Sequence, residues 1–263
     1  MIAFRKVHGA GNDFILVADS SHIRDWGKLA TGLCHRRTGI GADGLVVSER
    51  ISASAYAVTC YNPDGSVASM CGNALRCAAR CAADDYGETR LTLLMGGVSH
   101  HAVVDGSQIA VTVFVGPVRP RLLVVRRAGQ RFEFASVNSG TEHVVALAES
   151  VGGIDVAVLG RRVRDHCVLA PAGANVNFVQ LLDRSTLRIR TYERGVEAET
   201  LACGSGAVAA VTVARHVGAV TRGPVTVRNE AGMPLVGGRA EDPQEGAVWL
   251  TGPARVVYRG EAS

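Results

Sequence analysis

The chain has 263 residues, of which 47% are hydrophobic and 20% charged, and its formal net charge is +4. This balance is typical of globular proteins and excludes the disordered and fibrous classes. The basic residues are scattered without a long run, which argues against a nucleic-acid partner. Lysine occurs only at Lys6 and Lys28. Chemistry that needs a lysine Schiff base, including pyridoxal phosphate chemistry, is therefore not expected.

Two features of the sequence concern its compartment. The first residues include polar and charged side chains where a secretion signal needs an unbroken apolar core, and no stretch reaches the roughly 18 apolar residues of a membrane span. The seven cysteines are an odd number in a chain long enough to fold without disulfides, which indicates reduced thiols. We therefore expect a cytoplasmic protein with no membrane partner.

Short runs rich in Val, Ile and Leu, bounded by Gly, Pro, Asn and Asp, predict a fold dominated by strands. In chain order the expected strands are 14–17, 45–47, 56–61, 109–115, 144–148, 177–182, 187–192 and 248–251. Two Ala-rich stretches without internal proline predict helices over 74–84 and 207–217. Each helix directly follows a Cys-Gly pair, so Cys71 and Cys203 are expected at helix starts.

The sequence around these two cysteines is repeated. Residues 61–74 and 192–206 align with one inserted residue, and both predict a strand, a turn, a Cys-Gly pair and a helix. The equivalent cysteines are about 132 residues apart. The repeat predicts two similar lobes related by a pseudo-twofold axis, with their equivalent sites facing each other across a cleft. With a hinge at Gly116-Pro117 and a returning strand at 255–258, the lobes comprise residues 1–116 with 253–263, and residues 117–252.

Three other motifs have plainer explanations. Residues 39–44 (GIGADG) have the spacing of a dinucleotide-binding loop, but polar residues precede them and a strand follows, which favours a cluster of turns. Cys77 and Cys81 lie one helical turn apart without a second pair of ligands, which indicates a buried apolar face and no metal site. His100 and His101 have no partner at a suitable spacing and are expected at the surface.

Cys71 and Cys203 differ from the other cysteines because each is predicted at a helix N-terminus. The helix dipole and the unpaired N–H groups there lower the pKa of a thiol and favour the thiolate. A buried, unreactive thiol is the usual explanation for a single cysteine. Two cysteines at equivalent positions of a repeat favour catalysis instead, by a redox disulfide, a covalent nucleophile or an acid/base pair.

An acid/base pair accounts for the duplication. Inverting a tetrahedral carbon requires one group to remove a proton from one face and a second group of similar pKa to return a proton to the other face. One cysteine then starts as a thiolate and the other as a thiol. With an amino acid as substrate, the charge on its carboxylate would be stabilised by backbone N–H groups at the two helix starts. These groups belong to Gly72, Asn73, Gly204 and Ser205.

Six motifs occur in one order and spacing over nearly the whole chain. They are residues 6–14 (KVHGAGNDF), 37–44 (RTGIGADG), 62–66 (NPDGS), 70–73 (MCGN), 193–195 (ERG) and 199–206 (ETLACGSG). Together they resemble diaminopimelate epimerase. The resemblance implies an α/β (α+β) protein of two pseudo-symmetric lobes, each a mixed β-sheet wrapped around a central helix, with the active site in the cleft between them. It also implies a homodimer that needs no cofactor or metal and interconverts LL- and meso-diaminopimelate for lysine and peptidoglycan synthesis.

The same resemblance assigns roles to individual residues. It implies that Cys71 and Cys203 are the two bases and that His143 and Glu193 assist their proton transfers. It implies that Arg194 holds the distal carboxylate of the substrate in a bidentate fork while Glu193 takes the distal ammonium. The other substrate-binding residues that it implies are Asn12, Asn62 and Asn175.

The chain departs from the family pattern in one loop. A frequent Gly-Asn-Pro-His motif reads Gly140-Thr141-Glu142-His143 here, so Thr141 replaces the substrate-contacting Asn and Glu142 replaces the rigid Pro. Racemases of histidine, proline or hydroxyproline share the implied fold and cysteine pair, so a racemase of another amino acid is the alternative. The Glu193-Arg194 pair favours diaminopimelate.

Overall fold

A computed structural model describes residues 1–18, 25–127, 129–238 and 246–262. The chain divides into two compact units: unit 1 is Met1–Thr112 with Thr251–Ser263, and unit 2 is Val113–Leu250. In its described residues, each unit combines a mixed β-sheet with two α-helices. The predicted mixed α+β fold with two lobes is therefore confirmed.

Unit 1 is built from two consecutive β-α-β units with further antiparallel strands. Its elements are β1 (Ile2–Gly9), β2 (Asn12–Val17), α1 (Trp26–Cys34), β3 (Gly44–Ser52), β4 (Ala55–Tyr61), α2 (Gly72–Tyr86), β5 (Arg90–Met95), β6 (Val98–Asp105) and the larger parts of β7 (Gln108–Phe114) and of the last strand, β16 (Ala247–Ala262). Strands β1 to β7 are neighbours in chain order, and β16 pairs with β1. The pairs β2–β3 and β4–β5 are parallel, which requires a crossover between them, and α1 and α2 supply it.

Unit 2 repeats this topology. Its elements are β8 (Arg119–Arg127), β9 (Gln130–Asn138), β10 (Glu142–Ala148), α3 (Val156–Arg164), the 3-10 helix η1 (Cys167–Leu169), β11 (Asn175–Asp183), β12 (Thr186–Glu193), β13 (Ala198–Thr200), α4 (Gly204–His216), β14 (Val225–Arg228) and β15 (Leu235–Gly237). The neighbour order is β8-β9-β10-β11-β12-β14-β15. Here the parallel pairs are β10–β11, joined through α3, and β12–β14, joined through α4. The repeat seen around the two cysteines therefore extends to the strand pairing of each unit.

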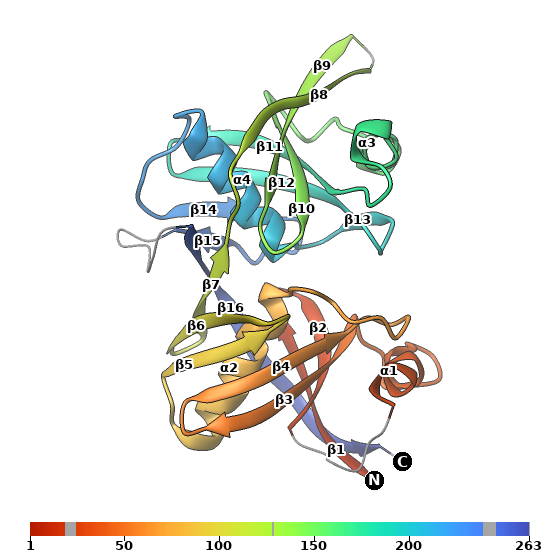
Figure 1. The fold of residues 1–263 in the computed structure, drawn as a ribbon, viewed down its shortest axis with the longest axis vertical. Coiled ribbons are helices and arrows are strands. Elements are labelled where there is room, and N and C mark those ends of the chain that lie inside the picture. Colours follow the sequence, from red (N-terminus) through yellow and green to blue (C-terminus); the bar gives the residue numbers. More distant parts are fainter. Residues whose placement is uncertain (19–24, 128, 239–245, 263) are drawn as a thin grey trace. The chain divides into compact units, whose positions relative to one another are not determined.

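Helices α2 and α4 lie at the centre of their units. Ten residues of each are buried, so protein covers α4 along most of its length and α2 up to its last turn. Helix α2 packs against β1 to β6, and α4 packs against β9 to β12, β14 and β15. Their buried residues are mostly Ala, Gly and Val, whose small side chains let a helix pack closely within a curved sheet. Figure 1 shows each of these helices crossing the strands of its own unit, with α1 and α3 to one side.

The predicted elements are found in the structure, and several others were missed. Every predicted strand lies within or overlaps a strand of the structure, and the predicted helices correspond to α2 and α4. The returning strand predicted at 255–258 is part of β16, where Lys6 in β1 is opposite Tyr258. Helices α1 and α3 were not predicted. None of the helices described is long and apolar enough to cross a membrane.

The expectation that His100 lies at the surface is wrong. His100 is buried, and its Nδ1 lies 2.7 Å from the carbonyl oxygen of Thr112. It belongs to a period-two series in β6 with Ala102 and Val104, which point to the core. The alternate residue, His101, is exposed as expected.

Candidate active site

Cys71 lies at the start of the central helix of unit 1. It is the N-cap of α2, with extended backbone angles, and its Sγ accepts the N–H of Ala74 at 3.5 Å. Its own N–H donates to the sulfur of Met95 at 3.3 Å. The side chain is half-buried. A thiolate at this position would face the positive end of the helix dipole and a backbone donor in the first turn.

Cys203 has the same local structure in unit 2. It is the N-cap of α4, also with extended backbone angles, and its Sγ accepts the N–H of Gly206 at 3.3 Å. The hydroxyl of Ser205 lies 3.5 Å from the same sulfur. Like Cys71, the side chain is half-buried. The prediction that both cysteines begin a helix is confirmed.

Gly206 packs closely against the side chains of Asn177 and Cys203. A Cβ on this residue would lie 2.6 Å from Oδ1 of Asn177 and 3.2 Å from Sγ of Cys203. Asn177 is fully buried and held by hydrogen bonds to Val144 and Thr191, so it has little freedom to move away. Only glycine avoids this close contact.

We expect Gly206→Ala to lower the free energy of unfolding by about 1–3 kcal/mol, the usual cost of overpacking a core. The matched control is Gly32→Ala in α1, where an added Cβ meets nothing within 4 Å. The control should raise stability by up to about 1 kcal/mol, because alanine favours a helix over glycine. Urea denaturation of both variants measures the difference. Equal stability of the two variants would show that the contact with Asn177 relaxes freely.

A buried chain of hydrogen bonds leads from Asn177 to Cys203. The Oδ1 of Asn177 accepts from Thr191 at 3.0 Å, so its Nδ2 faces Nδ1 of His143 at 3.1 Å as a donor. Nδ1 of His143 is then an acceptor, and Nε2 carries the proton toward the Ser205 hydroxyl at 3.0 Å. Ser205 can pass a hydrogen bond on to Sγ of Cys203.

Burial keeps His143 neutral. The side chain is fully buried, and desolvation, with a smaller contribution from the charge of Arg194, lowers the pKa of His143 to about 3. At neutral pH the ring is therefore a fixed hydrogen-bond donor to Ser205. The family resemblance implies that His143 assists a proton transfer. The structure suggests how: His143 orients the Ser205 hydroxyl, which lies beside the sulfur of Cys203.

Two of the expected clamp residues, Asn175 and Arg194, are joined by a hydrogen bond in unit 2. Asn175 accepts the backbone N–H of Arg194 through Oδ1 at 2.9 Å and donates through Nδ2 to the hydroxyl of Thr141 at 2.9 Å. The guanidinium of Arg194 donates through Nη1 to the carbonyls of Ala172 and Gly173 at 3.2 and 3.3 Å. Thr141, which replaces the usual Asn of the family, therefore helps to hold Asn175.

Glu193 precedes Arg194 at the end of β12. Its Oε2 accepts the hydroxyl hydrogen of Thr200 at 2.9 Å. Thr200 ends the short strand β13, which pairs with β12. The carboxylate of Glu193 is thus oriented by a neighbouring strand and remains half-buried.

In unit 1 a second hydrogen-bonded series brings Asn12 to the start of α2. Asn73 donates to Oδ1 of Asn12 at 3.0 Å, and Asn12 donates to Asp43 at 2.7 Å. On the other side, Arg76 donates through Nη2 to Oδ1 of Asn73 at 2.5 Å. Asp43 is in turn held by Arg36 at 2.6 Å. Sequence reasoning identified the two asparagines but missed Asp43 and Arg76.

Asn62 has a different setting within unit 1. It lies in the turn after β4, where its Nδ2 donates to the hydroxyl of Ser66 at 2.9 Å and its backbone N–H donates to the carbonyl of Ser66 at 2.8 Å. Asp64 accepts from the same Ser66 at 2.6 Å. These contacts account for Asn62 through turn structure, so its contact with a substrate stays a prediction.

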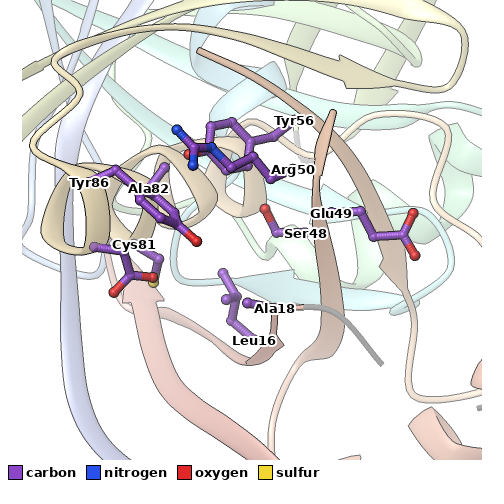
Figure 2. Close-up of a pocket in the computed structure, with 10 residues that line it drawn as sticks. Leu16, Ala18, Ser48, Glu49, Arg50, Tyr56, Cys81, Ala82 and Tyr86 are labelled. Carbon is purple, nitrogen blue, oxygen red and sulfur yellow. The ribbon is translucent and has the colours of Figure 1, made fainter. Parts of the chain in front are cut away.

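A hollow in unit 1 lies away from these residues. It is lined by Ser48, Arg50 and Tyr56 of the sheet and by Cys81 and Tyr86 of the later turns of α2 (Figure 2). The guanidinium of Arg50 lies 4.0 Å from the centre of the Tyr86 ring. None of the predicted site residues lines this hollow. In the part of the chain that the structure describes, no group of three or more His, Cys, Asp and Glu residues is placed to hold a metal ion.

Comparison with known proteins decides the family. The family model described as "Diaminopimelate epimerase" matches residues 4–119 and 135–257. The chain belongs to the diaminopimelate epimerase family. Both matched segments contain one of the two helix-capping cysteines, so the repeat that was visible in the sequence lies inside the family's own pattern.

Two members of the family match over almost their full length. The diaminopimelate epimerase of Aquifex aeolicus is 35% identical over 274 residues, which cover 99% of this chain and 97% of that protein. The diaminopimelate epimerase of Methanocella arvoryzae is 34% identical over 276 residues, which cover 99% and 96%.

Solved structures with lower sequence identity share the fold. A structure described as a predicted epimerase from Pseudomonas aeruginosa has a TM-score of 0.72 and 15% identity, and the match covers 100% of this chain and 99% of that one. A hydroxyproline epimerase from Agrobacterium vitis has a TM-score of 0.66 and 14% identity, covering 98% and 91%. At these identities the likeness concerns the fold alone.

Proposed function

We propose that the protein interconverts LL- and meso-2,6-diaminopimelate without a cofactor, using Cys71 and Cys203 as acid and base. The observation that carries the proposal is the duplicated cap: in each unit a half-buried cysteine begins the central helix, and its sulfur accepts an N–H from the first turn. Membership of the diaminopimelate epimerase family supports the choice of substrate.

The reaction moves one proton off the α-carbon and another onto it. In one direction the thiolate of one cysteine removes the α-proton and becomes a thiol, while the electron pair of the C–H bond passes to the α-carbon and its carboxylate. The thiol of the other cysteine then donates its proton to the opposite face and becomes a thiolate. Charge and protons balance, and the reverse reaction uses the same groups with exchanged roles.

Removal of the α-proton leaves a carbanion, and the proposed reaction uses no cofactor to accept its electron pair. Groups of the protein must therefore stabilise the negative charge. We propose that the reacting carboxylate binds to the N–H groups at the helix starts, contributed by Gly72 and Asn73 in unit 1 and by Gly204 and Ser205 in unit 2. These groups are the unpaired donors of an α-helix and lie at the positive end of its dipole. Donors fixed before the reaction stabilise the developing charge without reorganisation.

The distal amino-acid end of diaminopimelate gives the site its selectivity in this proposal. Arg194 binds the distal carboxylate, and Glu193 binds the distal ammonium. Asn175 supports this arrangement because it already holds the backbone of Arg194. Asn12, which Asn73 and Asp43 hold in place, and Asn62 complete the proposed binding residues.

The proposed setting of the enzyme follows from the family. We propose that the protein works as a homodimer in the cytoplasm and supplies meso-diaminopimelate for lysine and peptidoglycan synthesis. A homodimer is tested by light scattering of the purified protein, and a monomer at micromolar concentration would contradict it.

An isotope-exchange experiment tests the proposed reaction. The protein in reducing buffer and deuterated water should replace the α-proton of LL- and meso-diaminopimelate with deuterium, which NMR follows as loss of the α-proton signal. Histidine, proline and hydroxyproline serve as parallel substrates and should show no exchange. Exchange with one of these and not with diaminopimelate would identify a racemase of another amino acid and overturn the proposal.

A further inference from the structure

Arg76 is a fully buried arginine in the central helix of unit 1, five residues after Cys71. Its exposed fraction is 0%, and its guanidinium reaches the first turn of α2, where Nη2 donates to Oδ1 of Asn73 at 2.5 Å. Within the described residues, its Nε and Nη1 are buried without a hydrogen-bond partner. Burying a cation in this way costs free energy unless a negative charge compensates it.

The groups near Arg76 that could carry a compensating negative charge are the thiols of Cys77 and Cys71. Cys77 is fully buried, and burial raises the pKa of its thiol well above the usual value, so it stays neutral. Cys71 is half-buried and caps the helix. Burial lowers the pKa of Arg76 to about 10, which still leaves the side chain charged at neutral pH. A thiolate at Cys71 is therefore the anion that can compensate the charge of Arg76.

Cys60 completes these surroundings. A hydrogen bond with Cys71, together with burial, raises the pKa of Cys60 well above its usual value. Cys60 therefore stays a thiol, which can donate its hydrogen to the sulfur of Cys71. The cation of Arg76 and the thiol of Cys60 would each stabilise the charged form of the Cys71 sulfur.

Unit 2 differs at the equivalent positions. The residue five positions after Cys203 is Val208, which is buried and apolar. The group that faces Cys203 from within its unit is the Ser205 hydroxyl, held by neutral His143. Each cysteine lies at the N-terminus of its own helix, but only the helix of Cys71 has a buried cation five residues further on.

We propose that Arg76 is a positioning residue whose guanidinium holds Cys71 as the thiolate, so that in the resting enzyme the proton of the pair lies on Cys203. This inference rests on the proposed two-cysteine reaction. When Cys71 takes the α-proton, a turnover ends with a thiol at Cys71 and a thiolate at Cys203. Loss of a proton from Cys71 to water and gain of one by Cys203 then restore the resting state.

Thiol alkylation without substrate tests the inference. Iodoacetamide reacts with a thiolate, which displaces iodide, and peptide mass spectrometry gives a separate rate constant for each cysteine. At neutral pH we expect Cys71 of the unmodified protein to react at least about tenfold faster than Cys203. Arg76→Met should slow Cys71 by about tenfold and leave Cys203 unchanged, whereas Arg76→Lys should keep most of the preference because it retains the charge.

The matched control is Arg80→Met, one turn further along α2, where the guanidinium pairs with Asp84 at the surface side of the helix. It should leave both rate constants unchanged. Faster reaction of Cys203 in the unmodified protein, or equal slowing of Cys71 in Arg76→Lys and Arg76→Met, would overturn the inference. If Arg76→Met does not fold, the unmodified protein and Arg76→Lys still decide it. The alkylation experiment contains no diaminopimelate, so its result does not depend on the substrate. The proposed function is tested separately, by the α-proton exchange experiment described above.

Discussion

Cys71→Ala and Cys203→Ala are each expected to lower epimerisation at least about a hundredfold, the range in which a general acid or base contributes to a rate. In the proposed reaction each thiol serves one face of the α-carbon, so neither can replace the other. Both side chains are half-buried caps whose sulfurs accept one N–H. Losing such a cap costs about 1 kcal/mol, so both variants should still fold.

Proton exchange without inversion gives the sharper readout. A variant with one remaining cysteine can still remove a proton and return a deuteron on the same face, so each variant should label only one of the two stereoisomers. NMR in deuterated water distinguishes the isomers. The matched control is Cys167→Ala, an exposed cysteine in η1, which should keep full activity. Near-normal turnover in either Cys71→Ala or Cys203→Ala would refute the two-base reaction.

The central elements of the fold could be predicted because their signals are local. A Cys-Gly pair followed by small helix-forming residues indicates both helix starts, and the alternation of apolar residues indicates the strands around them. The two shorter helices gave no such signal. Helix α1 contains Gly27 and Gly32, and α3 contains Gly160, whose Cβ would lie 2.4 Å from the Tyr192 side chain. Close packing explains glycine at 27 and 160 despite its low helix propensity, whereas Gly32 has open space around it.

The site was predictable in part, because motifs give residue identities but not their partners. Asn12 and Asn73 belong to separate motifs 61 residues apart, and only the structure shows that they share a hydrogen bond. Thr141 was counted as a departure from the family, but in the structure it accepts a hydrogen bond from Asn175. Arg76 was missed because Asn73 and Arg80 lie on the same side of the helix, so the local sequence does not show that Arg76 is fully buried.

Arg194→Lys is expected to lower kcat/KM with diaminopimelate by roughly tenfold to a hundredfold. The proposed task of Arg194 is a planar, two-pronged hold on the distal carboxylate, which a lysine ammonium does not reproduce. Losing one charge-assisted hydrogen bond costs about 1.5–3 kcal/mol, which corresponds to this range. A lysine at this position also lacks the Nη1 group that binds the carbonyls of Ala172 and Gly173, so its ammonium group is held less firmly than the guanidinium.

The control for this substitution is Arg126→Lys in β8, an exposed arginine of unit 2, which should leave kcat/KM unchanged. Most of the loss in Arg194→Lys should appear in kcat, because a displaced distal end moves the α-carbon away from the reacting sulfurs, and a misplacement of about 1 Å can cost about a hundredfold in rate. A loss confined to KM would mean that Arg194 binds substrate and transition state equally. Full efficiency in Arg194→Lys would remove the distal carboxylate from the proposal, and a substrate with a single amino-acid end would then explain the cysteine pair better.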